Sequence, residues 1–494
     1  MHRRVPALCG VLFVLSLLFA GAVAKATRPA ARTQVPPEPT AWTSYANDNQ
    51  LRDSVFSKSL TQENVRRLSP LWTTELDGPI YASPLSVKVS GRQLLYVSTE
   101  AGSVYALSAA SGAIVWQRNL GTIDTDGCGT WGITSTGAID PTKGLLFVIG
   151  ATGSLHALSV STGADSEGYP EQIVSQTRYE YVWGGLRISA GRLYVPVASY
   201  CDVGAPDGAF PEGRLESIPL DRTDAAAVWD PVPGPDNLGG IWGWGGVSVD
   251  PRDGSIYTAV GNSHVRSDEC ACYVDDAGYG DHVVHLSADL SSVIDSERPT
   301  LPETGDYDFG AAPVLFQPRG CPPLAAANNK IGTLFIWDRS DLASGPLASI
   351  PIGDGLSPFI GTPAWSEARQ TIYEAQAVLF DSRGRLGNGV RAFRVVAGCR
   401  FQSLWAKAVG DGNQATPLVV GDAVFATGGN PGGFYALDAA TGARLWSAPT
   451  AGSTVAAMVT VGGTVFGADA EGAVYAFRPN AAELKLGGNR RGPF

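Results

Sequence analysis

The chain has 494 residues, a formal net charge of −11 and 44% hydrophobic residues. This length allows either several small domains or one large repeat fold. Basic residues form no stripe apart from a short pair near the C-terminus, Arg490 and Arg491. Because phosphate binding needs clustered positive charge, the sequence argues against nucleic acid as a partner.

The N-terminal residues have the pattern of a secretory signal peptide. Arg3 and Arg4 precede an almost wholly apolar run, and Ala22-Val23-Ala24 offers the small residues that a signal peptidase needs. We predict a signal peptide over residues 1–24; an uncleaved anchor is the alternative, because the run is almost long enough to span a bilayer. Residues 25–40 are rich in proline and predict a flexible linker. No later segment is apolar enough to cross a membrane, so we expect a secreted, periplasmic or cell-envelope protein.

Cysteine usage fits that location. Seven cysteines are present, and all except Cys9 lie beyond the predicted signal peptide. An even number of cysteines in an exported chain favours disulfide bonds. The sequence does not rank the possible pairings, and free buried thiols are the alternative. The six cysteines are Cys128, Cys201, Cys270, Cys272, Cys321 and Cys399.

One motif recurs along the chain. Residues 102–116 read GSVYALSAASGAIVW, and residues 433–446 read GFYALDAATGARLW. Weaker copies occupy residues 153–163 and 472–477. Each fuller copy predicts a short strand, a tight turn and a second strand. Self-similarity of this kind is typical of a repeat fold.

The turn within this motif has a specific chemistry. Asp438 is placed to accept backbone N–H groups at the first corner, and Gly442 can supply the positive φ that closes the hairpin. Trp446 ends the outer strand, where a large flat ring can wedge between neighbouring sheets. Four short strands per unit of about 40 residues are typical of a β-propeller. A two-sheet sandwich is the alternative, but it does not require regularly spaced glycine and tryptophan.

We therefore predict an all-β, eight-bladed propeller over residues 41–480, followed by a flexible tail at 481–494. The last unit lacks its outer strand, and we expect residues 71–76 to supply that strand and close the ring. Closure leaves no open sheet edge. The eight units begin near Gly78, Gly132, Val182, Gly240, Asp308, Phe359, Gly412 and Thr454.

The segment before the first unit adds a family resemblance. Trp42-Thr43-Ser44-Tyr45, Phe56-Ser57 and residues 64–68 precede Trp72. With the repeats, they resemble the pyrroloquinoline quinone (PQQ) repeat propellers of the quinoprotein alcohol dehydrogenase-like superfamily, over nearly the whole mature chain. This resemblance implies an oxidoreductase that binds PQQ and calcium. The repeat alone identifies a fold and says little about activity.

Residues 239–262 resemble the part of the family that holds the cofactor. The resemblance implies that Trp244, or Trp242 in its place, stacks on the quinone, because an indole face suits a planar ring. It also implies that Asn262 binds the calcium ion through its carbonyl oxygen. The alternatives are packing between blades for the tryptophans and a simple turn for Asn262.

Two later segments complete the predicted site. Residues 305–310 resemble the place of the catalytic aspartate and offer Asp306 and Asp308; we favour Asp306, although strand periodicity does not separate them. Residues around Lys330 resemble the segment whose basic side chain reaches the quinone oxygens, where a cation stabilises developing negative charge. Turn capping for the aspartates and an exposed lysine are the alternatives.

The chain also departs from the family. The family has two adjacent cysteines over the cofactor, whereas Cys128 stands without a neighbouring cysteine. The family's calcium-binding glutamate is absent, and Asp202 is the nearest replacement. Two functions therefore remain open: a PQQ- and calcium-dependent dehydrogenase of a small-molecule alcohol, or a non-catalytic propeller that binds a protein on one rim, as the outer-membrane assembly lipoprotein with the same repeat does.

Overall fold

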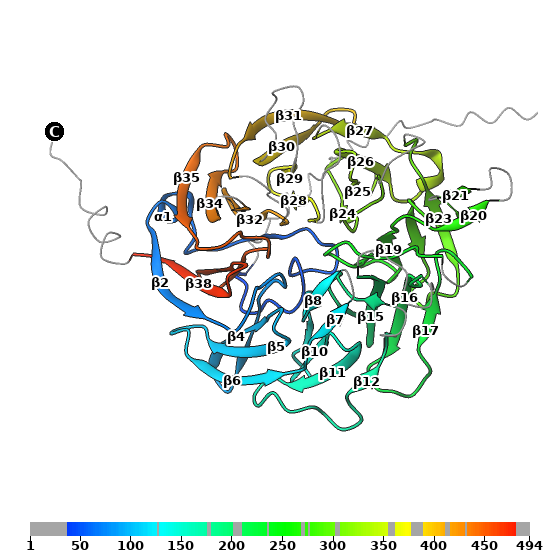
Figure 1. Cartoon of the computed structure of the whole chain (residues 1–494). Helices are drawn as coiled ribbons and strands as arrows, with labels where there is room; N and C mark the ends of the chain where they lie inside the picture. Colours follow the sequence, from blue (N-terminus) through cyan, green and yellow to red (C-terminus); the bar gives the residue numbers. More distant parts are fainter. Residues whose placement is uncertain are drawn as a thin grey trace, which may run out of the picture. The chain divides into compact units, whose positions relative to one another are not determined.

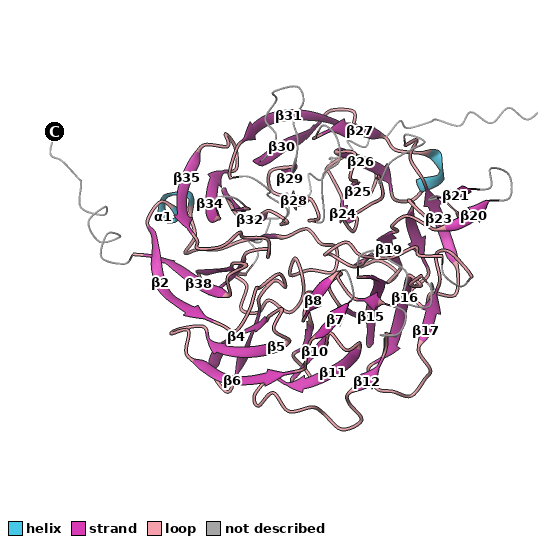
Figure 2. Cartoon of the chain, viewed as in Figure 1, coloured by secondary structure: helices cyan, strands magenta, loops and turns pink. Residues whose placement is uncertain are grey.

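Short antiparallel strands make up nearly all the regular structure of the chain, seen here in a computed structural model (Figure 2). Among the described residues, the helices are one α-helix, α1 (Gln62–Val65), and a short 3-10 helix (Leu342–Ser344). Neither of these helices has the length and apolar character needed to cross a membrane. The structure describes residues 37–125, 128–174, 179–200, 210–234, 237–267, 272–274, 277–301, 307–353, 361–376, 389–410, 415–429 and 432–480.

These residues belong to one compact unit, Pro37–Phe494, in which eight sheets form the blades of a ring (Figure 1). Blade one contains β3 (Leu85–Val89), β4 (Arg92–Ser98), β5 (Ser103–Ser108) and β6 (Ile114–Asn119), and blade two contains β9 (Ala138–Asp140), β10 (Leu145–Ile149), β11 (Ser154–Ser159) and β12 (Glu171–Gln172). Blade three contains β14 (Arg187–Ser189), β15 (Arg192–Ser199), β16 (Arg214–Pro219) and β17 (Ala227–Trp229), with β13 (Glu180–Tyr181) added. Blade four contains β18 (Ser248–Val249), β19 (Ile256–Ala259), β22 (Val283–Leu286) and β23 (Val293–Glu297).

Blades five to eight continue the same order. Blade five contains β24 (Val314–Phe316), β25 (Leu324–Asn328), β26 (Thr333–Asp338) and β27 (Ala348–Pro351), and blade six contains β28 (Ala364–Ser366), β29 (Thr371–Gln376), β30 (Gly389–Val396) and β31 (Arg400–Lys407). Blade seven contains β32 (Leu418–Val420), β33 (Ala423–Gly428), β34 (Gly433–Asp438) and β35 (Arg444–Pro449), with β1 (Ser54–Val55) added. Blade eight contains β36 (Val459–Val461), β37 (Thr464–Ala468), β38 (Ala473–Pro479) and β2 (Leu68–Glu75). Two hairpins stand outside the blades: β7 (Ile123–Thr125) with β8 (Gly129–Trp131), and β20 (Val265–Ser267) with β21 (Cys272–Val274).

The N-terminal strand closes the ring. β2 pairs antiparallel with β38, from Leu68 opposite Pro479 to Glu75 opposite Ala473. Blade eight is thereby completed by a strand from the other end of the chain. The predicted eight-bladed, all-β propeller is confirmed, as is its closure by the N-terminal strand. The hydrophobic core lies largely between adjacent blades, where for example Phe147 of blade two and Leu193 of blade three belong to one buried cluster.

Tryptophan and glycine of the repeat lock successive blades together. The Trp405 indole N–H, from blade six, donates to Ala439 O of blade seven at 3.2 Å. Gly442 has φ 70°, and a Cβ there would lie 2.7 Å from the Trp405 ring. Only glycine therefore lets the turn rest on the indole. Asp438 Oδ1 accepts the Thr441 N–H at 2.7 Å, so the predicted turn chemistry is confirmed.

Residues 39–55, which we call the crossing segment, run across the ring and bond to every blade in turn (Figure 1). Trp42 exchanges two main-chain hydrogen bonds with Ser86 of blade one, and β1 pairs parallel with β32 of blade seven. The other contacts are Thr43 O to Ile139 N, Asn49 Nδ2 to Ile188 O, Asn49 O to Val249 N, Gln50 O to Leu315 N, Arg52 O to Trp365 N, and Pro39 O to Gly462 N.

A buried arginine fastens this segment from blade three. The Arg187 guanidinium is 0% exposed and donates to Ser44 Oγ at 2.7 Å, Tyr45 O at 3.1 Å and Asp48 O at 3.1 Å. Burial lowers the pKa of Arg187 to about 10, which still leaves the side chain charged near neutral pH. The crossing segment is thus held by the ring at both its main chain and its side chains.

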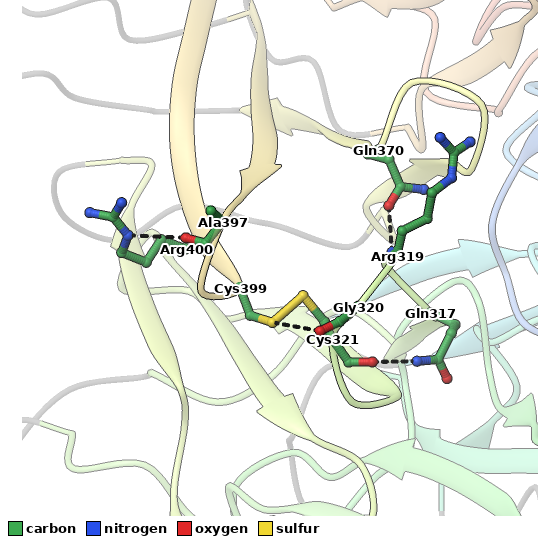
Figure 3. Close-up of a disulfide and its surroundings, with 8 residues drawn as sticks. All are labelled: Gln317, Arg319, Gly320, Cys321, Gln370, Ala397, Cys399 and Arg400. Carbon is green, nitrogen blue, oxygen red and sulfur yellow. Dashed lines mark hydrogen bonds between the residues drawn. A yellow bond between two sulfur atoms is a disulfide. The ribbon is translucent and has the colours of Figure 1, made fainter. Parts of the chain in front are cut away.

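One disulfide joins blades five and six (Figure 3). Cys321 lies in the turn between β24 and β25, and Cys399 lies in the turn between β30 and β31. Around it, Arg319 N donates to Gln370 Oε1 at 2.6 Å, which adds a second link between the two blades. Cys128 is also disulfide-bonded. The expectation of disulfides is confirmed for these three cysteines.

Candidate functional site

The predicted site residues that the structure describes lie in loops at one end of the ring axis. Trp242 and Asp308 precede the innermost strands of blades four and five, whereas Asn262 and Lys330 follow the second strands of the same blades. Consecutive strands of a blade are antiparallel, so both kinds of loop lie at the same end. The crossing segment instead bonds within the innermost strands.

A cluster of small and aromatic side chains separates the two levels. Trp244 is 8% exposed and packs with Tyr45 and Leu51 of the crossing segment and with alanines that precede other innermost strands, such as Ala312. Trp242 packs against this cluster from outside and is only partly buried. Trp244 therefore belongs to the floor of the axial site, and Trp242 lies above it.

Three side chains of the predicted site are in direct contact. The Trp242 indole N–H donates to Asp308 Oδ2 at 2.7 Å, and Lys330 Nζ lies 2.7 Å from Asp308 Oδ1. Lys330 Nζ also lies 4.7 Å from the centroid of the Trp242 ring, within the range of a cation–π contact. The Asp308 side chain is 1% exposed and that of Lys330 is 14% exposed. Charge-assisted hydrogen bonds between side chains with so little solvent exposure are strong, and they fix all three side chains.

Local backbone contacts explain why these residues meet. Lys330 lies in the turn between β25 and β26, where Gly332 has φ 81° and its N–H donates to Asn329 O at 3.0 Å. The Lys330 N–H donates to Asp308 O at 3.1 Å. The turn between β25 and β26 is therefore hydrogen-bonded to the loop that precedes β24 of the same blade. This bond places the Lys330 side chain next to the Asp308 carboxylate.

Glycine brings the segment of Asn262 close to this group. A Cβ on Gly261 would lie 3.1 Å from both Asp308 Oδ2 and Trp242 Cδ1. A side chain at this position would push these neighbours away by a few tenths of an ångström, so glycine favours the close approach. Asn262 itself is partly buried, and its main-chain oxygen accepts the Gly239 N–H at 3.0 Å. Asn262 is thus placed next to Trp242 and Asp308 by the backbone.

Two predicted residues, Asp202 and Asp306, lie outside the described residues. Their predicted roles therefore stay predictions, as do the signal peptide, the linker and the C-terminal tail. Within the described ranges, no group of three or more His, Cys, Asp or Glu side chains is placed to hold a metal ion. The oxygen donors available there near the site are Asp308 and Asn262.

Sequence reasoning missed a buried polar pair beside Lys330. Asn328 Nδ2 donates to Glu374 Oε1 at 2.8 Å, from the end of β25 to β29 of blade six. Both side chains are 0% exposed. A signal was present, because Glu374 is the one charged residue of the strand segment TIYEAQ, and charged residues are rarely buried without a partner.

Aromatic side chains of the β7–β8 hairpin and of blade three stand at the same end of the axis and were also missed. Trp131, in β8, contacts Trp183 edge-on with ring centroids 4.9 Å apart, and Tyr181 lies 5.1 Å from Trp183. The Trp183 indole N–H donates to Ser199 O at 2.6 Å, which fixes its orientation. Thr134 Oγ1 links Tyr181 to Glu100, and burial raises the pKa of that glutamate.

The chemistry of the site fits a planar, anionic ligand. The Trp242 indole offers an aromatic face, and the Lys330 ammonium beside it offers a positive charge. Aromatic stacking and a cation together suit a quinone that carries acidic groups. Carboxylate and amide oxygens such as those of Asp308 and Asn262 suit a hard cation such as calcium. PQQ and a metal ion are therefore compatible with the residues that the structure brings together.

Comparisons with known proteins agree with this fold. The family model described as "Glucose/ethanol/alcohol dehydrogenase, beta-propeller domain" matches residues 42–178, and the one described as "Outer membrane protein assembly factor BamB" matches residues 390–485. Together with the eight blades, these partial matches show a PQQ-repeat β-propeller fold similar to that of the quinoprotein alcohol dehydrogenases. The resemblance predicted from the sequence is confirmed at this level.

The chain is similar to a polyvinylalcohol dehydrogenase of Sphingopyxis sp. (strain 113P3), with 25% identity over 422 residues. The alignment covers 77% of this chain and 62% of that relative, so the chain spans less than two thirds of the relative's length. A solved europium-containing methanol dehydrogenase shares the fold with a TM-score of 0.72 and 14% identity, over 89% of this chain and 98% of that one. The quinohemoprotein alcohol dehydrogenase of Comamonas testosteroni gives 0.69 and 16%, over 88% and 80%.

Proposed function

We propose that the chain is an exported oxidoreductase that oxidises an alcohol with PQQ and calcium bound at the end of the propeller axis where Trp242, Asp308 and Lys330 lie. The contact of Trp242, Asp308 and Lys330 carries this proposal, because it gathers an aromatic face, a carboxylate and a cation in one buried place. The alcohol dehydrogenases among the similar proteins support it. The predicted signal peptide supports export to the periplasm or beyond.

The residues divide the work of holding the cofactor and the ion. Trp242 would stack on the quinone, with Trp244 forming the floor beneath it. Lys330 would contact the quinone oxygens, and Asn262 with Asp202 would bind the calcium ion. The chemistry that bound PQQ would supply is a two-electron oxidation, in which the alcohol loses two electrons and two protons and becomes an aldehyde or ketone.

The protein's own part in the reaction is to bind, orient and accept a proton. Both Asp308 oxygens are engaged, one by the Trp242 indole and one by the Lys330 ammonium. Because both of its oxygens are already bound, we assign Asp308 to anchoring and keep Asp306 as the proton acceptor. The ammonium of Lys330 would stabilise negative charge on the reduced quinone.

A protein-binding propeller is the second candidate. The match of residues 390–485 to the assembly-factor family favours it, as do the missing cysteine pair and the missing glutamate. In that case one rim of the ring would bind a protein partner, and no cofactor would be needed.

Ligand titration separates the two candidates. Purified protein is titrated with PQQ in the presence of calcium, and binding is followed by tryptophan fluorescence. A planar ring stacked on an aromatic side chain gains about 1–3 kcal/mol, so Trp242→Ala should weaken binding by about 5- to 150-fold. Removing calcium with a chelator should also weaken it.

Trp446→Ala is the control, because Trp446 bonds to Leu68 O at the outer edge of blade eight and should affect stability alone. Absence of quenching in the wild type, with no calcium dependence, would reject the oxidoreductase and leave the protein-binding propeller. A loss of affinity in Trp244→Ala but not in Trp242→Ala would assign the stacking to the other tryptophan.

A second pair of variants tests the two aspartates. Asp306→Asn should bind PQQ as the wild type does but lose dye reduction with short alcohols by about 100-fold or more, since general-base catalysis contributes factors of that size. Asp308→Asn should instead weaken PQQ binding, because the charge that holds Lys330 is gone. Stopped-flow dye reduction and equilibrium titration measure the two effects. The opposite pattern would make Asp308 the base.

A further inference from the structure

The buried pair of Asn328 and Glu374 has no part in the roles assigned above. In the described part of the chain, Asn328 Oδ1 and Glu374 Oε2 lack a hydrogen-bond partner. Buried polar atoms left unpaired cost free energy, and most proteins avoid them. An apolar pair at the interface of blades five and six would be more stable. The position of the pair, directly before the Lys330 turn, suggests a reason for it.

A continuous set of contacts leads from Glu374 to the site. Glu374 holds Asn328, the last residue of β25, from the neighbouring blade. The next residue, Asn329, donates through Nδ2 to Tyr307 O at 3.1 Å. Lys330 follows, and its N–H donates to Asp308 O. The turn that carries Lys330 is therefore held by blade six on one side and by residues 307–308 on the other.

Glu374 is suited to this task because its side chain is fully buried against Asn328. Burial raises the pKa of Glu374 well above its ordinary value, which favours the neutral carboxylic acid. In that form its carbonyl oxygen accepts the Asn328 amide N–H, and it carries no negative charge that would compete with Asp308 for the Lys330 ammonium. A glutamine has the same shape, no charge and the same acceptor, which makes Glu374→Gln the conservative substitute.

We propose that Glu374 is a positioning residue which, through its hydrogen bond to Asn328, sets the Lys330 turn so that the ammonium group lies on Asp308 and over Trp242. The effect of Glu374 on PQQ affinity rests on the proposed function. The role of Glu374 in placing Lys330 does not rest on it, because Trp242, Asp308 and Lys330 are in contact without any cofactor.

The first test uses the protein without cofactor. The indole N–H signal of Trp242 is identified among the 12 tryptophans by its loss in Trp242→Phe, in a two-dimensional NMR spectrum of the full chain. Lys330→Ala should shift this signal, since it removes the cation from the ring. Glu374→Ala should shift it in the same direction, and Glu374→Gln should leave it at the wild-type position.

Asp53→Asn is the matched control, because Asp53 is another carboxyl with 0% exposure and a raised pKa, on the crossing segment. It should leave the Trp242 signal unchanged. A Trp242 signal that stays in place in Glu374→Ala would overturn the proposal. If Glu374→Ala does not fold, Asn328→Ala removes the same hydrogen bond from the other partner and must give the same shift.

The second test measures coupling through PQQ affinity. Glu374→Ala should raise the PQQ dissociation constant about tenfold, the effect expected for a lost buried hydrogen bond, and Glu374→Gln should restore it. In a Lys330→Ala background, Glu374→Ala should have no further effect, because the residue acts through the lysine. Equal losses in both backgrounds would show that Glu374 merely stabilises the fold. If the wild type binds no PQQ, the proposed function fails, while the NMR result still decides the role of Glu374.

Discussion

Asp53 shows how a single buried carboxyl makes the stability of this fold depend on pH. Its side chain is 0% exposed, and neither oxygen has a hydrogen-bond partner among the described residues. Burial, and next the charge of Asp48, raise the pKa of Asp53 well above its ordinary value. The folded protein thus keeps this carboxyl protonated at a pH where the unfolded chain releases the proton.

The sign of the pH effect follows from this difference. Stability falls with rising pH wherever the folded state binds more protons than the unfolded state. The contribution of Asp53 is therefore fully present below its unfolded pKa and is lost as the pH rises toward its folded pKa. Glu374, whose pKa burial also raises, acts in the same direction.

Asp53→Asn should remove much of this loss. The amide keeps the shape of the protonated acid, and asparagine tolerates the φ of 45° at this position. We expect the variant to be more stable than the wild type by about 1–3 kcal/mol at pH 8, with a smaller difference at pH 5. Urea unfolding across this range measures both. Parallel pH profiles of the two proteins would contradict the raised pKa.

For the stacking position, the sequence favours Trp244 and offers Trp242 as its substitute, whereas the structure brings Trp242 into contact with Asp308. The spacing of the two tryptophans does not say which side chain faces Asp308. That choice depends on the irregular loop around Gly243, and a loop of this kind has no periodicity to read. Lys330 was proposed from a resemblance, whereas its contact with Asp308 depends on a turn that only the folded blade defines.

At the level of elements, the crossing segment is the least regular part of the fold and one of the most connected. It contains a single two-residue strand, β1, yet it bonds to all eight blades. Its residues Ala46, Asn47, Leu51 and Asp53 have positive φ values, which keep it from continuing as a strand. Its order therefore comes from the ring around it and from the side chains of Tyr45 and Leu51 beneath Trp244.

Deleting this segment should damage the fold far more than deleting what precedes it. Removal of residues 1–56 takes away hydrogen bonds to eight blades and the buried side chains of the floor. At about 1 kcal/mol per hydrogen bond and about 2 kcal/mol per buried side chain, we expect a loss of more than about 5 kcal/mol.

Removal of residues 1–36 is the control and should change the free energy of unfolding little. Chemical unfolding of the three proteins decides the matter. Equal stability of the two truncated forms would show that the crossing segment only rests on the ring.

Sequence reasoning found the strands of the repeat but not this segment. In blades one and seven the repeat carries its glycine and tryptophan at fixed spacing, and Gly442 against Trp405 shows the contact that requires the glycine. Residues 39–55 have neither alternation nor repeat. The family resemblance pointed to this stretch without saying where it lies, because its contacts are with strands up to several hundred residues away.

For the whole molecule, the axis of the ring holds two separate groups of residues: one packs the centre of the fold, and the other forms the candidate site. The crossing segment and the cluster around Trp244 pack against each other, and Trp242 packs against this cluster and contacts Asp308, which contacts Lys330. The number of blades and the ring closure could be predicted, since both follow from the repeat count and the missing outer strand. The arrangement of the site could not, because it depends on loops from blades four, five and six meeting in space.

The pairing of β2 with β38 also ties folding to the direction of synthesis. The ribosome makes residues 68–75 long before it makes their partner strand at residues 473–479. Until that partner is made, blade eight lacks the pairing that closes the ring, and the two strand edges that later meet are available to other chains.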